Sequence, residues 1–125
     1  MKALVIDDSR GARILLTKIL QNFGFEVHDE PLATSALSHL AGDSASYDIA
    51  FVDVFMPEMN GIEFVRRVRD NPLYDQMFLL MVTSDASEGR MMEAMEAGAD
   101  EYLIKPVDKQ ALKVKLEFLG FTFRT

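Results

Sequence analysis

The chain has 125 residues and a formal net charge of −7, since 13 Lys and Arg stand against 20 Asp and Glu. This length predicts one domain over residues 1–125 with no output domain, and the acidic balance disfavours a protein that binds the phosphate backbone of nucleic acid. The lack of cysteine excludes disulfides and thiolate metal sites, and the lack of a signal peptide or a membrane-spanning apolar run predicts a soluble, cytoplasmic protein.

Apolar, β-prone runs alternate with stretches of helical spacing along the chain. In order, the predicted strands are residues 2–6, 25–29, 49–52, 78–82 and 101–104. The predicted helices begin after Ser9, at Pro31, at Ile62, near Glu88 and near Asp108. Residues 41–47 and 56–61 are expected to form loops. Strands that alternate with helices predict a mainly parallel α/β sheet with right-handed crossovers.

Polar residues follow four of the predicted strands at the point where each strand ends. Asp7 and Asp8 follow the first strand and Asp53 the third, while Thr83 and Lys105 follow the fourth and fifth. The carboxyl ends of parallel strands meet at one edge of a sheet, and ligands of such folds bind there. We therefore expect these five residues to form one charged functional site.

The chemistry of these side chains fits phosphoryl transfer. Mg²⁺ prefers oxygen ligands, which Asp7, Asp8 and Asp53 supply. A carboxylate attacks phosphorus to form an acyl phosphate when cations neutralise the charge of the incoming group, and Mg²⁺ and Lys105 would provide that neutralisation. The hydroxyl of Thr83 would donate a hydrogen bond to a phosphoryl oxygen. The predicted site is therefore a switch as much as a catalyst.

Several motifs resemble the receiver domain of two-component response regulators over nearly the whole chain. They are Val-Ile-Asp-Asp at residues 5–8, Asp-Val-Phe-Met-Pro-Glu-Met-Asn-Gly at 53–61, Thr-Ser at 83–84 and Gly-Ala-Asp-Glu-Tyr-Leu-Ile-Lys-Pro at 98–106. The resemblance implies a flavodoxin-like, doubly wound sheet of five parallel strands in the order 2-1-3-4-5, with five helices. Residues 113–120 are similar to the endings of chemotaxis-type single-domain receivers.

The resemblance also implies the role of each site residue. Asp53 would accept a phosphoryl group from the phosphohistidine of a histidine kinase or phosphotransfer protein, and Lys105 would pair with the phosphoryl oxygens. Mg²⁺ would be bound by Asp8, by Asp53 and by the backbone carbonyl of Phe55, while Asp7 would act through water.

Two further residues would transmit the signal. Thr83 is the expected switch hydroxyl, and Tyr102 is the aromatic residue that would move inward when Thr83 is drawn toward the phosphate. A cis peptide bond is expected before Pro106. The fourth helix, fifth strand and fifth helix would form the surface that binds the target. On that fourth helix, Met91 is expected to be the one exposed methionine.

The resemblance therefore implies a stand-alone response regulator. It would not be an enzyme, apart from its own phosphorylation and dephosphorylation at Asp53. Its target would be a protein, such as a component of the flagellar motor switch in chemotaxis. Alternatives are a phosphate sink or a phosphorelay intermediate. Less favoured are an aspartate-based phosphatase, which would need a cap over its substrate, and a constitutive interaction module, which would need no acidic site.

Three features stand apart from the family pattern or outside the site. Phe55 and Asp85 occupy positions said to tune phosphoryl lifetime in the family, and we expect the bulk of Phe55 to exclude the hydrolytic water. The apolar tail, residues 121–125, would pack either on its own core or on another chain. His28 and His39 are interpreted as isolated surface residues without a metal or catalytic role.

Overall fold

The computed structural model describes residues 1–42 and 46–123, and its strands form one sheet. The strands are β1 (Lys2–Ile6), β2 (Glu26–Glu30), β3 (Ile49–Val52), β4 (Phe78–Thr83) and β5 (Glu101–Ile104). Each neighbouring pair is parallel, and the order across the sheet is β2-β1-β3-β4-β5. The predicted fold class, a doubly wound sheet of order 2-1-3-4-5, is confirmed.

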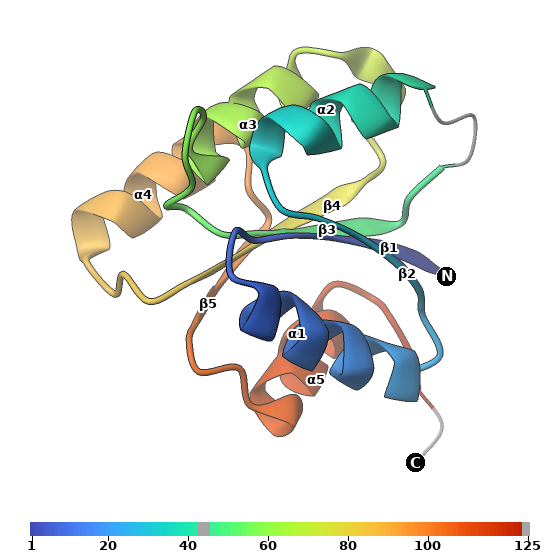
Figure 1. The fold of residues 1–125 in the computed structure, drawn as a ribbon. Coiled ribbons are helices and arrows are strands. Elements are labelled where there is room, and N and C mark those ends of the chain that lie inside the picture. Colours follow the sequence, from blue (N-terminus) through green and yellow to red (C-terminus); the bar gives the residue numbers. More distant parts are fainter. Residues whose placement is uncertain (43–45, 124–125) are drawn as a thin grey trace.

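Helices cover both faces of this sheet (Figure 1). They are α1 (Arg10–Asn22), α2 (Ala33–Gly42), α3 (Gly61–Arg69), α4 (Glu88–Ala97) and α5 (Lys109–Phe118), together with a 3-10 helix, η1 (Pro72–Tyr74). Helices α2, α3 and α4 lie on one face, and α1 and α5 on the other (Figure 1). Among the described residues, no helix has both the length and the apolar character needed to cross a membrane.

The central strands are buried on both faces because their apolar side chains alternate between two cores. In β1, Leu4 belongs to the core beneath α2, α3 and α4, whereas Val5 belongs to the core beneath α1 and α5. All four residues of β3 are buried as well. A strand that is buried on both faces cannot accommodate a charged side chain along its length, so the charged side chains of Asp7 and Asp53 lie beyond the carboxyl ends of β1 and β3.

The ends of four helices follow the signals in the sequence. Ser9, Asn60 and Asp108 cap α1, α3 and α5, because each side chain accepts a hydrogen bond from a backbone N–H in the first turn of its helix. Helix α4 ends at Gly98, which adopts the left-handed conformation with φ 119°. Local chemistry therefore decides where the chain turns back toward the sheet.

Several local predictions were wrong. Strand β2 is shifted by one residue from the predicted 25–29, and α3 begins at Gly61, which was expected to end a loop, rather than at Ile62. Helix α2 begins at Ala33 rather than at Pro31, and it continues through Gly42, which was expected to lie in a loop; residues 43–45 of that loop lie outside the described residues. On α4, Met92 and Met95 are the exposed methionines, at 61% and 42%. Met91 packs against the core instead, because it faces the sheet side of the helix.

The apolar tail packs on the protein's own core as far as the structure describes it. The ring of Phe121 lies 5.5 Å from that of Phe25 and 5.7 Å from that of Phe78, and the ring of Phe123 lies 4.9 Å from that of Phe23. These centroid distances are typical of favourable aromatic pairs. The tail therefore extends the core under α1 and α5; Arg124 and Thr125 lie outside the described residues.

Candidate functional site

The five polar residues predicted to form a site lie together at the carboxyl edge of the sheet. Backbone hydrogen bonds continue the sheet beyond the strand ends: the N–H of Asp53 donates to the carbonyl of Ile6 at 3.0 Å, and that of Lys105 to the carbonyl of Thr83 at 2.8 Å. The parallel register pairs Ile6 with Val52, so Asp7 and Asp53 follow side by side, and it pairs Thr83 with Ile104, the residue before Lys105. The sheet backbone itself positions the site.

Lys105 reaches across this edge to two buried carboxylates. Its Nζ lies 2.7 Å from Oδ2 of Asp7 and 3.3 Å from Oδ2 of Asp53. Asp7 and Asp53 are only 5% and 8% exposed. Two carboxylates at this depth need a cation or hydrogen-bond donors nearby, because charges buried without partners are costly. The ammonium group of Lys105 is therefore the positive centre of the site.

The environment shifts the proton affinity of both partners. Burial, and then the charge of Asp7, raise the pKa of Asp53, while the charge and hydrogen bond of Lys105 oppose that rise only in part. For Lys105, burial by itself lowers the pKa of the ammonium, but the hydrogen bond of Asp7 and the charges of both carboxylates outweigh it and raise the pKa overall. One ammonium group therefore does not fully compensate the charge of the carboxylates.

The carboxylates have the character of a site for a hard divalent cation. One oxygen from each of Asp7, Asp8 and Asp53 lies within 4.8 Å of the others. Asp8 is exposed, whereas Oδ1 of Asp7 accepts from the N–H of Ser9 at 2.9 Å and Oδ2 pairs with Lys105. An all-oxygen donor set with excess negative charge fits Mg²⁺. Asp8 and Asp53 are better placed to bind it directly than Asp7, whose oxygens already have partners.

A glycine lets α3 approach the backbone of Asp53 closely. A Cβ atom at Gly61 would lie 2.0 Å from the carbonyl oxygen of Asp53 and 2.9 Å from Cγ1 of Val52, closer than atoms can pack. The N–H of Gly61 also donates to the carbonyl of Val54 at 2.8 Å. Gly61 is part of the motif at residues 53–61, but this role was not predicted from the sequence. An Asn-Gly pair just before an amphipathic helix was the available signal.

Thr83 and Tyr102 contact the same residue of the loop between β4 and α4. Oγ1 of Thr83, which is fully buried, accepts a hydrogen bond from the N–H of Asp85 at 3.3 Å. The hydroxyl of Tyr102 donates to the carbonyl of Asp85 at 2.9 Å. Burial, and then the charge of Asp85, raise the pKa of the Tyr102 phenol, so the phenol remains a hydrogen-bond donor. In this structure the Tyr102 side chain is directed inward.

Arg90 at the start of α4 connects the two residues expected to tune phosphoryl lifetime. Its Nε lies 3.5 Å from Oδ2 of Asp85, and its guanidinium lies 5.3 Å from the centre of the Phe55 ring, within the range of a cation–π contact. Phe55 is 50% exposed. The role of Arg90 was not predicted, because a lone arginine on a helix carries no signal of contacts with two separate loops.

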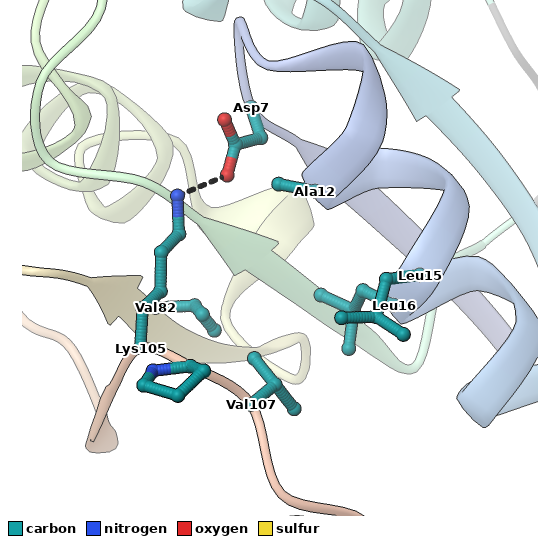
Figure 2. Close-up of a pocket in the computed structure, with 8 residues that line it drawn as sticks. Asp7, Ala12, Leu15, Leu16, Val82, Lys105 and Val107 are labelled. Carbon is teal, nitrogen blue, oxygen red and sulfur yellow. Dashed lines mark hydrogen bonds and ion pairs between the residues drawn. The ribbon is translucent and has the colours of Figure 1, made fainter.

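An apolar cavity lies next to the acidic cluster formed by Asp7, Asp8 and Asp53. Its volume is about 380 Å³, and Asp7 and Lys105 line one end of it. Figure 2 shows their ion pair on one side and Leu15, Leu16 and Val107 farther in. The remaining lining residues are Ala12, Val82 and Pro106. The peptide bond between Lys105 and Pro106 is cis, as the family resemblance implied.

Comparison with known proteins gives a consistent result. Residues 3–117 match the family model of the response regulator receiver domain. A chemotaxis protein CheY homolog of Campylobacter jejuni is 35% identical over 120 residues, which are 94% of this chain and 90% of that protein. Chemotaxis protein CheY1 of Helicobacter pylori is 33% identical over 94% of each chain. A solved structure of chemotaxis protein CheY4 of Vibrio cholerae matches with a TM-score of 0.86 and 33% identity, over 94% of this chain and 96% of that one.

Proposed function

Because the chain belongs to the response regulator receiver domain family, we propose that it is a stand-alone response regulator phosphorylated on Asp53. The observation that carries this proposal is the position of Asp53, a buried carboxylate held between a second carboxylate and the ammonium group of Lys105. A structural salt bridge needs one acid and one base. Here two buried carboxylates share one ammonium group, and this arrangement fits a site that binds Mg²⁺ and receives a phosphoryl group.

The proposed reaction moves a phosphoryl group from a histidine to Asp53. An oxygen of the ionised Asp53 carboxylate attacks phosphorus, the P–N bond of the phosphohistidine breaks, and the electron pair leaves with the imidazole, which takes up a proton. The product is an aspartyl phosphate. Lys105, already 3.3 Å from Asp53, pairs with the incoming phosphoryl oxygens, because their charge must be neutralised during transfer.

Mg²⁺ is the cofactor that fits this donor set. Asp8, Asp53 and the backbone carbonyl of Phe55 would hold the ion, and Asp7 would act through water. When bound, Mg²⁺ supplies positive charge that neutralises the phosphoryl oxygens. Asp7 has a second function in this proposal, since its 2.7 Å hydrogen bond to Nζ directs Lys105 toward Asp53.

The proposed output is a change of partner binding at α4, β5 and α5. A phosphoryl group adds about −1.5 to −2 charge at Asp53, and Thr83 would donate its hydroxyl to it. A movement of Thr83 toward the phosphoryl group would act on Asp85, which is hydrogen-bonded to both Thr83 and Tyr102. On the nearby surface, the exposed Met92 and Met95 suit a partner helix, because methionine adapts to different shapes.

The relatives named above are chemotaxis proteins, and on that basis we place this chain in two-component signalling of the chemotaxis type. Its partners would be a histidine kinase or phosphotransfer protein upstream and a protein target downstream, such as a flagellar motor switch component. It would act in the cytoplasm through its receiver domain, without turnover of other substrates.

Intact mass after incubation with acetyl phosphate and Mg²⁺ tests the proposal. We expect a labile gain of one phosphoryl group in the wild type and none in Asp53→Ala or in the absence of Mg²⁺. Asp75→Ala is the matched control, because Asp75 is exposed and lies outside the site. No gain in the wild type would favour a constitutive interaction module. Catalytic turnover of a generic phosphate ester would instead favour a phosphatase.

A further inference from the structure

The two histidines of the chain are stacked on each other, away from the acidic site. His28 lies on β2 and His39 on α2, and their ring centres are 3.8 Å apart with an angle of 11° between the planes. The interpretation of both as isolated surface residues is therefore wrong. They are eleven positions apart in sequence, and the packing of α2 against the edge strand β2 brings them together.

Glu30 adds a carboxylate to the histidine pair. His28 and Glu30 are two residues apart on β2 and so point to the same face of the strand. Nε2 of His28 lies 2.5 Å from Oε2 of Glu30. One ligand atom from each of His28, Glu30 and His39 lies within 4.8 Å of the other two. The side chain of His28 is 41% exposed and that of Glu30 is 18% exposed, so an ion can reach them from solvent.

We propose that His28, His39 and Glu30 bind a divalent transition-metal ion, for which Zn²⁺ is the probe. Two imidazoles and one carboxylate are a donor set that Zn²⁺ accepts, with a water molecule in the fourth position. Mg²⁺ prefers oxygen ligands and keeps several waters. The two metal-binding regions of this protein therefore differ in ligand chemistry, and this inference does not depend on the proposed phosphorylation.

Binding requires a small rearrangement of the histidine pair. An imidazole binds a metal in the plane of its ring, and in a parallel stack the two nitrogen lone pairs do not converge. Zn²⁺ with ligands at about 2.0–2.2 Å in a tetrahedron needs ligand atoms roughly 3.3–3.6 Å apart. A tilt of the exposed His28 ring opens the stack, and the ion then replaces the contact between His28 and Glu30.

Tyr47 holds the second imidazole in place. The hydroxyl of Tyr47 lies 2.6 Å from Nε2 of His39, and Tyr47 is itself buried at 8% exposure. Imidazoles that bind metals commonly have one ring nitrogen hydrogen-bonded to an oxygen, which orients the ring. His39 is thus the fixed ligand and His28 the movable one, and the bound ion would link α2 to β2.

Titration with Zn²⁺ in excess Mg²⁺ tests this site, because Mg²⁺ keeps the acidic cluster occupied. Calorimetry should show one Zn²⁺ per chain, with the affinity at least about tenfold weaker in His28→Gln and in Glu30→Gln. Glu26→Gln is the matched control, since Glu26 is an exposed acid two residues from His28 on the same strand, and it should bind like the wild type. Equal binding by His28→Gln and the wild type would overturn the proposal.

A second readout identifies the ligands without relying on variants. The chain has two histidines, so its imidazole NMR signals come from His28 and His39 alone. We expect both sets of signals to change together up to one equivalent of Zn²⁺ and to stay unchanged with Mg²⁺. A change in neither histidine, or in only one, would overturn the proposed site. The readout needs no phosphorylation, so its failure is distinct from failure of the receiver function.

Discussion

The hydroxyl of Tyr102 donates a 2.9 Å hydrogen bond to the backbone carbonyl of Asp85. The two are seventeen positions apart in sequence, and the bond connects β5 to the loop that follows β4. The N–H of the same Asp85 donates to Oγ1 of Thr83. The backbone N–H and the backbone carbonyl of Asp85 are therefore both hydrogen-bonded to the two residues proposed to form the switch.

Removing the Tyr102 hydroxyl should weaken this connection without removing the ring. We expect Tyr102→Phe to lower the free energy of unfolding by about 0.5–1.5 kcal/mol, because one hydrogen bond is lost while the packing is kept. Urea denaturation measures this difference. Tyr74→Phe is the control, since within the described residues the hydroxyl of Tyr74 makes no hydrogen bond. An equal effect of both substitutions would contradict the importance of the Asp85 contact.

The ionised carboxylate of Asp53 should lower the free energy of unfolding at neutral pH. Burial and the charge of Asp7 raise its pKa above the ordinary value of 3.8, so the folded state disfavours the ionised form. We expect Asp53→Asn to raise the free energy of unfolding at pH 7, without Mg²⁺, by about 1 kcal/mol.

The stability difference between Asp53→Asn and the wild type should depend on pH. As pH falls through the raised pKa, the wild-type carboxyl takes up its proton in the folded state, so the advantage of Asp53→Asn should shrink and reach its minimum below 3.8. Urea denaturation across a pH series measures it. Asp75→Asn should show no such trend. A variant less stable than the wild type at pH 7 would contradict the expected effect.

Gly61 should tolerate no side chain. Because a Cβ there would lie 2.0 Å from the carbonyl oxygen of Asp53, we expect Gly61→Ala to cost roughly 1–3 kcal/mol or more of stability and to slow phosphorylation of Asp53. Gly89→Ala is the matched control: nothing lies within 4 Å of its added Cβ, and alanine favours the helix by up to about 1 kcal/mol. Thermal unfolding and the phosphorylation assay compare them. A normal Gly61→Ala protein would refute the close approach.

Phe55 should slow loss of the phosphoryl group. Its half-exposed ring beneath Arg90 would hinder the hydrolytic water, so we expect Phe55→Asn to speed dephosphorylation roughly threefold, equivalent to about 0.7 kcal/mol. Arg90→Gln should act in the same direction, since it releases the ring. The decay of the phosphorylated mass measures both, with Phe118→Asn on α5 as control. An unchanged rate in Phe55→Asn would remove the proposed tuning role.

The aromatic tail should contribute to stability. Phe121 contacts the rings of Phe25 and Phe78, and we expect Phe121→Ala to cost about 1–2 kcal/mol, less than a fully buried phenylalanine. Phe118→Ala is the matched control, because that ring is 78% exposed and its loss should change stability by under about 0.5 kcal/mol. Thermal unfolding compares them. Equal effects would show that the tail packing is not stabilising.

Several features were predictable from the sequence because their causes are local. Apolar runs such as residues 49–52 have one stable environment, a strand covered on both faces. Ser9, Asn60 and Asp108 satisfy the free N–H groups of the helix that follows each of them. A parallel sheet places all its carboxyl ends at one edge, so Asp53 and Lys105 were expected at the same edge.

Contacts between distant side chains were decided only by the tertiary structure. Lys105 bonds more closely to Asp7 than to Asp53, across 98 residues of sequence, and Arg90 joins two loops. The two histidines looked isolated because no local pattern records which side chains a helix and a strand place together. Sequence by itself determined the elements and the edge where the site lies, because hydrophobic periodicity and capping act over a few residues. The pairing of charges, rings and ligands depends on how those elements pack.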